Sequence, residues 1–490
     1  MRIFFAVDIH RLRVANVVSL QLQLVLKACF VIFATSTVAA AADLYVQAGA
    51  DADGTGTLNR PFNTLLAAQQ RANPHDTFFL LPGVDGAALT GGIALDRGQK
   101  LIGLGADGRR PARGAIPVVR VVPSPGAPSR ALVEAAIDTE IRGIHFEVTT
   151  FPAIAAAAAL QPDPYSKLLI HHNLFTGEAN EQADVVYAID LDALVGSVSG
   201  VRVRDNVFKD GGSMGGVRVT QRGHSQGIYR FERNRFADLG ARAYYVLTTE
   251  DSEAITKILD STANNIGRGN RNSDSILPYL MGRSRQTMLV KGYRYSNTAR
   301  VGNASNTGLE LWILGGRDDP STWCTGCRVK LDIVDSTFDD AVTDGIQLTN
   351  FGSNTVMDIT IRNTKVRRAN PRQAGGAVSL IAENAQNSGS RGTLLIEHSD
   401  LSDSSQYAVV VVDATPGPSA IVDLGGGALG SRGGYRLSGA GKGGIMTQEV
   451  SISARRNWWG DAGPKVVTAG NDVIVDVDPV LTVDPAVRQH

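Results

Sequence analysis

The chain has 490 residues, 43 % of them hydrophobic, and its 48 Lys and Arg residues are balanced by 48 Asp and Glu residues. This length and hydrophobic content allow a large buried core. The zero net charge removes any compositional argument for a nucleic-acid-binding or membrane-surface protein. The 53 glycines favour a fold with a turn every few residues.

The first 42 residues have the features of an export signal. Three arginines precede an apolar run at 28–38, and the small residues 39–42 offer a cleavage site before Asp43. No later stretch reaches the ~18 consecutive apolar residues that a membrane-spanning helix needs. We therefore expect a secreted or periplasmic protein without a membrane span.

The next segment, 43–110, is expected to cap the N-terminal end and to form the first coil of a repeat. Residues 63–72 place Leu65 and Leu66 at helical spacing, with Asn63 as the N-cap. A short helix here would cover the core and the strand edges that an open repeat array exposes.

A short pattern returns about every 30 residues from position 141 to 459, and most of it lies within 111–456, the expected body of the domain. It consists of an apolar residue, two polar residues, a residue that is often Asn or Ser, any residue, and a large apolar residue. The residues three before and two after each centre are mostly apolar, as inward-facing stacks require. Short alternating strands at this period predict a solenoid. The centres are Ile144, Asn173, Asn206, Asn234, Ser261, Tyr293, Ser336, Asn363, Ser399 and Asn457.

The two ends of this array resemble a known family. The run from Asp43 through Leu80-Leu81-Pro82-Gly83, and the closing Asn457-Trp458-Trp459-Gly460-Asp461, are similar to the first and last segments of exported bacterial, pectate-lyase-like β-helix proteins. The resemblance implies an all-β, right-handed parallel β-helix solenoid with an N-terminal capping helix. It also implies that the repeated Asn is a structural ladder and that 457–490 closes the C-terminal end. Because this fold hosts lyases, hydrolases, epimerases, adhesins and tailspikes, it leaves the activity open.

Two cysteines follow the expected signal, Cys324 and Cys327. A zinc site needs about four ligands, and no second cysteine pair supplies them. A local disulfide that braces a loop is the favoured prediction, with free thiols and with redox or metal chemistry as the alternatives.

An aspartate recurs between two strands of a coil. An Asx-turn is the favoured role, because Asp tolerates the left-handed conformation that such turns need. No cofactor is predicted with certainty, and Ca²⁺ is the alternative, although it takes six to eight oxygen ligands. The recurring residues are Asp210, Asp238, Asp340 and Asp403.

Cations dominate the outward positions of the strands before the first six centres. Adjacent coils are ~4.8 Å apart, close to the rise of one sugar in an extended glycan. A row of cations at this interval could hold the carboxylates of an acidic polysaccharide. An ordinary charged strand surface is the competing interpretation. The cations are Arg142, His171, Arg202, Arg204, Arg230, Lys257 and Lys291.

These residues lead to a first hypothesis, an exported monomer that acts on or binds an anionic polysaccharide and not nucleic acid. Lyases of the resembled family use Lys or Arg for β-elimination, which implies Lys257 as base and Arg230 and Arg204 as carboxylate clamps. The two tryptophans could stack on sugar rings. The expected substrate-binding residues are Arg202, His171, Lys291, Trp312 and Trp323.

Two alternatives stay open, and with them the question of whether the chain is an enzyme. One is a non-catalytic, adhesin-like surface or periplasmic β-helix that binds glycan or a cell partner. The other is a glycoside hydrolase, because Thr343-Asp344-Gly345-Ile346 resembles part of the catalytic motif of polygalacturonases. Paired carboxyl groups at a suitable separation are what glycoside hydrolysis needs. The acidic residues would be Asp339, Asp340 and Asp344.

Overall fold

The computed structural model divides the chain into two units, residues 1–41 and 42–490. It describes residues 40–485 apart from residues 106, 300 and 471 and several segments. The expected export signal, 1–42, therefore lies almost entirely outside the described residues. The segments left out are 110–116, 124–129, 157–166, 179–183, 194–196, 269–272, 302–305, 315–322, 371–374, 383–388 and 414–419.

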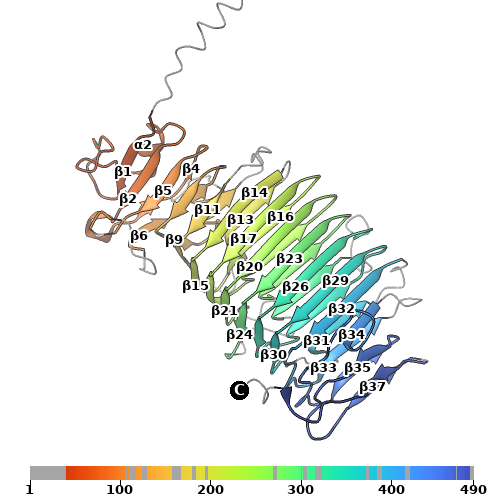
Figure 1. The fold of residues 1–490 in the computed structure, drawn as a ribbon. Helices are drawn as coiled ribbons and strands as arrows, with labels where there is room; N and C mark the ends of the chain where they lie inside the picture. Colours follow the sequence, from red (N-terminus) through yellow and green to blue (C-terminus); the bar gives the residue numbers. More distant parts are fainter. Residues whose placement is uncertain are drawn as a thin grey trace, which may run out of the picture. The chain divides into compact units, whose positions relative to one another are not determined.

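The described part of the second unit is a stack of coils with three parallel sheets (Figure 1). Most coils contribute one strand to each sheet in turn, and every pair of neighbouring strands in the sheets runs parallel. The predicted parallel β-helix is confirmed.

The largest sheet has 15 strands in the described residues. They are β1 (Asp43–Gln47), β2 (Thr77–Leu81), β5 (Lys100–Gly103), β8 (Glu140–Arg142), β11 (Leu169–His171), β14 (Ser197–Arg204), β17 (Gln226–Glu232), β20 (Glu253–Leu259), β23 (Arg285–Lys291), β26 (Arg328–Val334), β29 (Val356–Arg362), β32 (Arg391–Glu397), β34 (Ala420–Gly425), β36 (Ile452–Ala454) and β38 (Val475–Asp476).

The second sheet has 10 strands in the described residues: β3 (Leu89–Thr90), β6 (Val119–Val122), β9 (Ile144–Val148), β12 (Leu174–Gly177), β15 (Val207–Gly211), β18 (Arg235–Leu239), β21 (Thr262–Asn264), β24 (Arg294–Ser296), β27 (Thr337–Asp339) and β30 (Lys365–Arg367). The third has 13: β4 (Ile93–Ala94), β7 (Val133–Glu134), β10 (Ile154–Ala156), β13 (Val186–Ala193), β16 (Met214–Gln221), β19 (Tyr244–Thr248), β22 (Ile276–Leu280), β25 (Leu309–Ile313), β28 (Ile346–Asn350), β31 (Gly376–Ala382), β33 (Tyr407–Asp413), β35 (Gly443–Gln448) and β37 (Val466–Ala469).

The N-terminal helix α2 (Leu65–Gln69) is shorter than the predicted 63–72. The predicted N-cap Asn63 is wrong by one residue, because the Thr64 hydroxyl accepts the bond from the Ala67 amide at 3.1 Å. A Thr hydroxyl satisfies one of the unpaired amides of the first turn as an Asn side chain would. The helix buries Leu65 in the hydrophobic core.

Stacked aromatic rings fill the core beneath the 10-stranded sheet. Phe146, Phe175, Phe208 and Phe236 occupy the same position in successive coils and are almost completely buried. Their ring centroids are 5.3, 4.6 and 4.6 Å apart. The alternation of the sequence places one such ring inward from each coil, since successive side chains of a strand point to opposite faces.

The predicted asparagine ladder lies at the turn between the 15-stranded and 10-stranded sheets. The Asn173 amide donates to Asn206 Oδ1 at 3.0 Å, and the Asn206 amide donates to Asn234 Oδ1 at 3.1 Å. All three side chains are buried. Each carboxamide thus satisfies backbone groups at a corner where the sheets leave them unpaired.

One centre of the predicted repeat is wrong by a single residue. Thr364, not Asn363, occupies the ladder position: its amide donates to Ser399 Oγ at 3.3 Å, and its hydroxyl donates to the Arg362 carbonyl at 2.9 Å. Asn363 is exposed. Because side chains alternate with period two, this slip moves Ile361 into the core and Thr360 out of it.

Cys324 and Cys327 form a disulfide, and both residues are buried. The short loop that they close is bound to both neighbouring coils. The Thr325 amide donates to the Gly282 carbonyl at 2.7 Å, and the Gly326 amide donates to the Ser353 carbonyl at 2.8 Å. The cross-link therefore braces a loop between coils.

Candidate functional site

The predicted basic face exists on the outer surface of the 15-stranded sheet. Arg202, Arg230 and Lys257 are register partners on the successive strands β14, β17 and β20. Arg202 and Lys257 are exposed and have no ion pair within the described residues. Arg230, which is paired with Glu232, lies between them.

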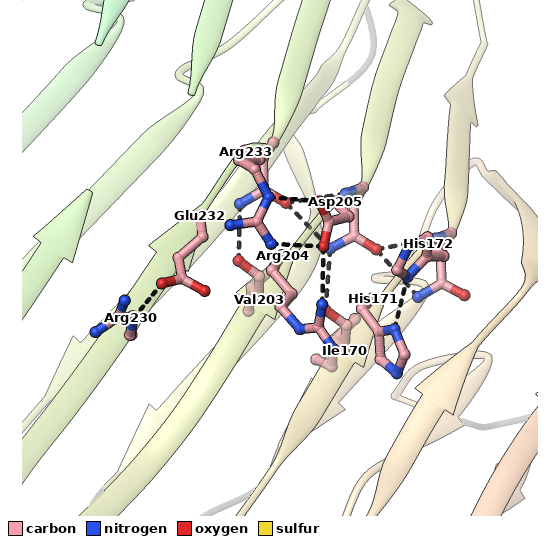
Figure 2. A network of polar contacts seen from close by, with 12 residues as sticks. Ile170, His171, His172, Val203, Arg204, Asp205, Arg230, Glu232 and Arg233 are labelled. Atoms are coloured by element: carbon pink, nitrogen blue, oxygen red, sulfur yellow. Dashed lines mark hydrogen bonds and ion pairs between the residues drawn. The ribbon is translucent and has the colours of Figure 1, made fainter. Parts of the chain in front are cut away.

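The remaining cations of this face are held by carboxylates (Figure 2). Arg230 is paired with Glu232, and Arg204 Nη1 lies 3.0 Å from Asp205 Oδ2. Asp205 also accepts two bonds from Arg233, at 2.8 and 2.9 Å. Although burial opposes it, the Arg233 guanidinium holds the pKa of the Asp205 carboxyl below its usual value. Arg204 and Arg230 are thus neutralised in the free protein.

The histidine on this face also has a local partner. His171 Nε2 lies 3.1 Å from Glu140 Oε1, and its Nδ1 lies 2.7 Å from His172 Nδ1. The hydrogen bond from His171 lowers the pKa of Glu140, against the opposing effect of burial. His171 is buried rather than displayed for a ligand.

A pocket of ≈430 Å³ opens on the basic face. It is lined by four cations, Lys167, Arg202, Arg204 and Arg233, and by a single carboxylate, Glu232. Lys257 does not line it, and Lys291 lies 3.8 Å from Asp335.

The predicted aromatic residues lie elsewhere. Trp312 is on β25 of the 13-stranded sheet, and Trp323 precedes the disulfide loop before β26. A lyase site would need base, clamp and aromatic residue to converge. The structure does not bring Lys257, Arg204 and Trp312 together on one face.

The predicted acidic residues separate into two groups. Asp339 lies 2.6 Å from Arg367 and 3.1 Å from Arg368, and Asp340 accepts two bonds from Arg368 at 2.8 and 3.0 Å. The hydrogen bonds that Arg368 donates to Asp340 raise the pKa of the Arg368 guanidinium. These two carboxylates form ion pairs between adjacent coils and are not poised for acid–base chemistry.

We therefore expect Asp340→Asn to leave any catalytic rate unchanged within about twofold. The lost pair with partly exposed Arg368 should lower the free energy of unfolding by about 1 kcal/mol. Activity and chemical denaturation measured on the same preparation test both statements. A loss of activity without a loss of stability would return Asp340 to the site.

Asp344 differs from its two predicted partners. It is buried, and its Oδ1 accepts a bond from the Gly376 amide at 2.7 Å and another from the Ser379 hydroxyl. Burial raises the pKa of Asp344 even though these bonds favour its charged form. Its repeat position, two residues before a strand of the 13-stranded sheet, is shared with Asp274 and Thr307.

The sequence analysis missed two neighbouring carboxyl groups on the 13-stranded sheet, those of Glu310 and Asp274. Glu310 points outward from β25 between the inward residues Leu309 and Leu311. Burial raises the pKa of Glu310 well above its usual value. The charge of Asp274 and a hydrogen bond between Asp274 and Glu310 raise it further. Asp344 adds to this rise. Glu310 thus combines a raised pKa with a partly exposed side chain.

Asp274, the hydrogen-bond partner of Glu310, is itself held by several neighbours. It is 1 % exposed, and its Oδ1 accepts bonds from the Thr307 amide at 3.1 Å and the Thr307 hydroxyl at 2.5 Å. Arg242 Nε lies 3.7 Å from its other oxygen. These contacts fix the orientation of the Asp274 carboxyl group beside Glu310.

Aromatic side chains border the carboxyl pair. Tyr245 and Tyr279 have ring centroids 6.3 Å apart, and Tyr279 is the register partner of Trp312. Arg242 lies over the Tyr245 ring at 5.4 Å. Burial raises the pKa of Tyr245 to about 12, so the ring stays neutral. Aromatic faces beside hydrogen-bonding groups suit the binding of sugar rings.

Two negative findings concern the described residues alone. They hold no cluster of three or more His, Cys, Asp or Glu side chains arranged to bind a metal ion. They also contain no helix with the length and apolar character needed to cross a bilayer.

Comparison with known proteins finds likeness only among solved structures. No family model and no curated protein matches the chain. The catalytic unit of a GH87 α-1,3-glucanase from Streptomyces thermodiastaticus strain HF3-3 is 14 % identical, covering 88 % of this chain and 67 % of its own, with a TM-score of 0.45. Bacteriophage CBA120 tailspike protein 3 is 11 % identical, covering 89 % and 58 %, with a TM-score of 0.39. The A-module of the Azotobacter vinelandii mannuronan C-5 epimerase AlgE4 is 13 % identical, covering 90 % and 98 %, with a TM-score of 0.35.

Proposed function

We propose that this protein is a polysaccharide-cleaving enzyme whose active site is the outer face of the 13-stranded sheet around Glu310. The observation that carries the proposal is the partly exposed Glu310, whose pKa is raised by burial and by the charge of the neighbouring Asp274. A carboxyl group whose pKa is strongly raised by burial and by a charged neighbour is typical of a catalytic acid. The exported location and the acidic polysaccharide expected from the sequence belong to the same proposal.

Glu310 is the proton donor of the proposed reaction. In glycoside hydrolysis the bond between the anomeric carbon and the leaving oxygen breaks, and a carboxylic acid gives its proton to that oxygen. Burial and the charge of Asp274 raise the pKa of Glu310, which favours the protonated form that a general acid needs. Asp274 is almost completely buried and acts as a positioning residue.

Asp344 is the base of the proposed reaction. It takes a proton from the water whose oxygen forms the new bond to the anomeric carbon. Its hydrogen bonds from Gly376 and Ser379 fix the orientation of the carboxyl group. The site therefore uses one of the three predicted acidic residues, with Glu310 in place of Asp339 and Asp340.

β-Elimination at the basic face is the second candidate function. Lys257 favours it, because this exposed amine lies beside Arg230 in register and has no carboxylate partner within the described residues. Lys257 itself does not line the basic pocket, and no aromatic residue is among those that do. We rank it second for these reasons.

The two candidates give different products from the same substrate. We expect the full chain, incubated with a panel of acidic and neutral polysaccharides, to release reducing ends without any ultraviolet absorbance of an unsaturated uronate. Absorbance that rises together with the reducing ends would establish β-elimination and move the site to Lys257. If neither signal appears on any substrate, the non-catalytic binding protein becomes the better account.

A further inference from the structure

A groove of ≈520 Å³ follows the corner between the 15-stranded and 10-stranded sheets. It lies above the buried ladder and is formed by two outward rows. One row is the left-handed residue that precedes each ladder position, and the other is the first residue of β15, β18, β21 and β24. The second row continues beyond the groove onto β27 and β30. Neither row contributes to the core, so packing does not dictate its residue types.

The strand row alternates with a period of two coils. Arg235, Thr262, Arg294, Thr337 and Lys365 are successive register partners. A cation therefore returns on every second strand, with a hydroxyl on each strand between. Since strands are ~4.8 Å apart, neighbouring cations of this row are about 9.6 Å apart. That distance is about the length of two sugar units in an extended glycan.

The turn row alternates in the opposite phase. Asp260 and Asp335 are on the coils of Thr262 and Thr337, whereas Gly292 is on the coil of Arg294. One kind of coil thus offers a carboxylate and a hydroxyl, and the other offers a cation. Gly292 keeps the groove open, because a Cβ at this position would collide with Asp260 Oδ1.

The cations of the strand row are available to a ligand. Arg235, Arg294 and Lys365 are exposed and have no ion pair within the described residues. The nearby Arg233, in contrast, is bound in two places to Asp205 (Figure 2). A guanidinium without a protein partner can form a bidentate bond to a carboxylate or sulfate group.

We propose that this groove binds an acidic polysaccharide with a disaccharide repeat, in which one sugar of every two carries the anionic group. The anionic sugars lie on the cationic coils. The neutral sugars lie on the coils between, where carboxylate and threonine oxygens bond to their hydroxyl groups. A polymer charged on every sugar is repelled by Asp260 and Asp335.

The residues that line the groove also argue against a nucleic acid. Proteins that hold single strands without sequence preference stack the bases on aromatic side chains. The lining residues include no Phe, Tyr or Trp. The proposal does not rest on Glu310, which lies on another sheet.

Titration calorimetry with the full chain tests the proposal against three probes. An oligosaccharide of alternating glucuronate and N-acetylglucosamine should bind at least about 10-fold more tightly than oligogalacturonate of equal length. A neutral cello-oligosaccharide should bind more weakly still. Equal or tighter binding of oligogalacturonate would overturn the proposed match between a disaccharide repeat and two coils. Displacement of the alternating probe by single-stranded DNA would overturn the proposal that the groove selects a polysaccharide.

Two charge variants separate the groove from general electrostatics. Arg235→Ala with Arg294→Ala should weaken the alternating probe about 100-fold. Arg328→Ala with Lys330→Ala removes the same charge from exposed positions of β26 and should change the affinity less than twofold. Equal losses in both double variants would contradict a specific groove.

A third variant changes the preference rather than the affinity. Thr262→Arg places a cation on a coil that offers a hydroxyl group in the parent chain. The affinity for oligogalacturonate should therefore rise relative to the affinity for the alternating probe. An unchanged ratio of the two affinities would overturn the assignment of coils. Glu310→Gln should bind the alternating probe like the parent chain, so the groove and the proposed active site can fail separately.

Discussion

Replacing Glu310 with Gln is expected to lower polysaccharide hydrolysis by about 10²- to 10⁴-fold, the usual contribution of a general acid. Gln has nearly the same shape and can still donate a hydrogen bond to Asp274, but it has no proton to give to a leaving oxygen. Initial rates of reducing-end release, compared at equal amounts of folded protein, measure the effect. Glu253→Gln, at the start of β20 on another sheet, is the matched control and should keep the parent rate.

The same variant should change the pH dependence of stability in a defined direction. The pKa of Glu310 is raised in the folded protein, so the native state holds a proton that the unfolded chain loses above about pH 4.5. The free energy of unfolding should therefore fall as pH rises from that value to the raised pKa. Glu310→Gln removes this contribution, and the variant should be more stable than the parent above that window. A less stable variant at neutral pH would contradict a protonated Glu310.

The pH–rate profile offers a separate check on the assigned roles. Activity should fall on the alkaline side as Glu310 loses its proton. It should fall on the acid side as Asp344, whose pKa is also raised by burial, gains one. A profile that rises with pH and stays high would instead fit an amine base such as Lys257.

The architecture was predictable because it depends on a local rule that repeats. Ladder residues such as Asn206 and inward rings such as Phe208 recur at fixed offsets, and each contributes to the fold in the same way. The rule failed at Asn363, where the adjacent Thr364 satisfies the same backbone groups. Only the buried neighbour Ile361 distinguishes the two registers, and one residue of slip exchanges the two faces of the strand.

The candidate site was less predictable because its residues interrupt the repeat. Asp274, Thr307 and Glu310 are contributed by two coils of different length, so their contact depends on how the coils stack. The structure places Arg202, Arg230 and Lys257 in one row, but sequence alone did not pair Arg204 with Asp205 or Arg230 with Glu232. One signal was available: Asp274 and Asp344 both stand two residues before a strand of the same sheet.

Replacing Phe208 with Ala should destabilise the domain by about 3–5 kcal/mol, the range for a buried Phe. Its ring is 0 % exposed and lies 4.6 Å from the rings of both Phe175 and Phe236, so the variant loses two stacked contacts and leaves a cavity. Chemical denaturation followed by circular dichroism measures the change. Ile228→Ala is the control, because Ile228 is 47 % exposed, and its effect should stay within about 0.5 kcal/mol.

The size of this effect also tests how the stack is held together. Each coil of a solenoid contacts only its neighbours, so stability is a sum of coil and interface terms. Loss of the central ring weakens two adjacent interfaces at once, and unfolding of the variant should separate into more than one transition. A single transition displaced by less than about 1 kcal/mol would mean that the neighbouring rings close the gap and that the aromatic stack contributes little to stability.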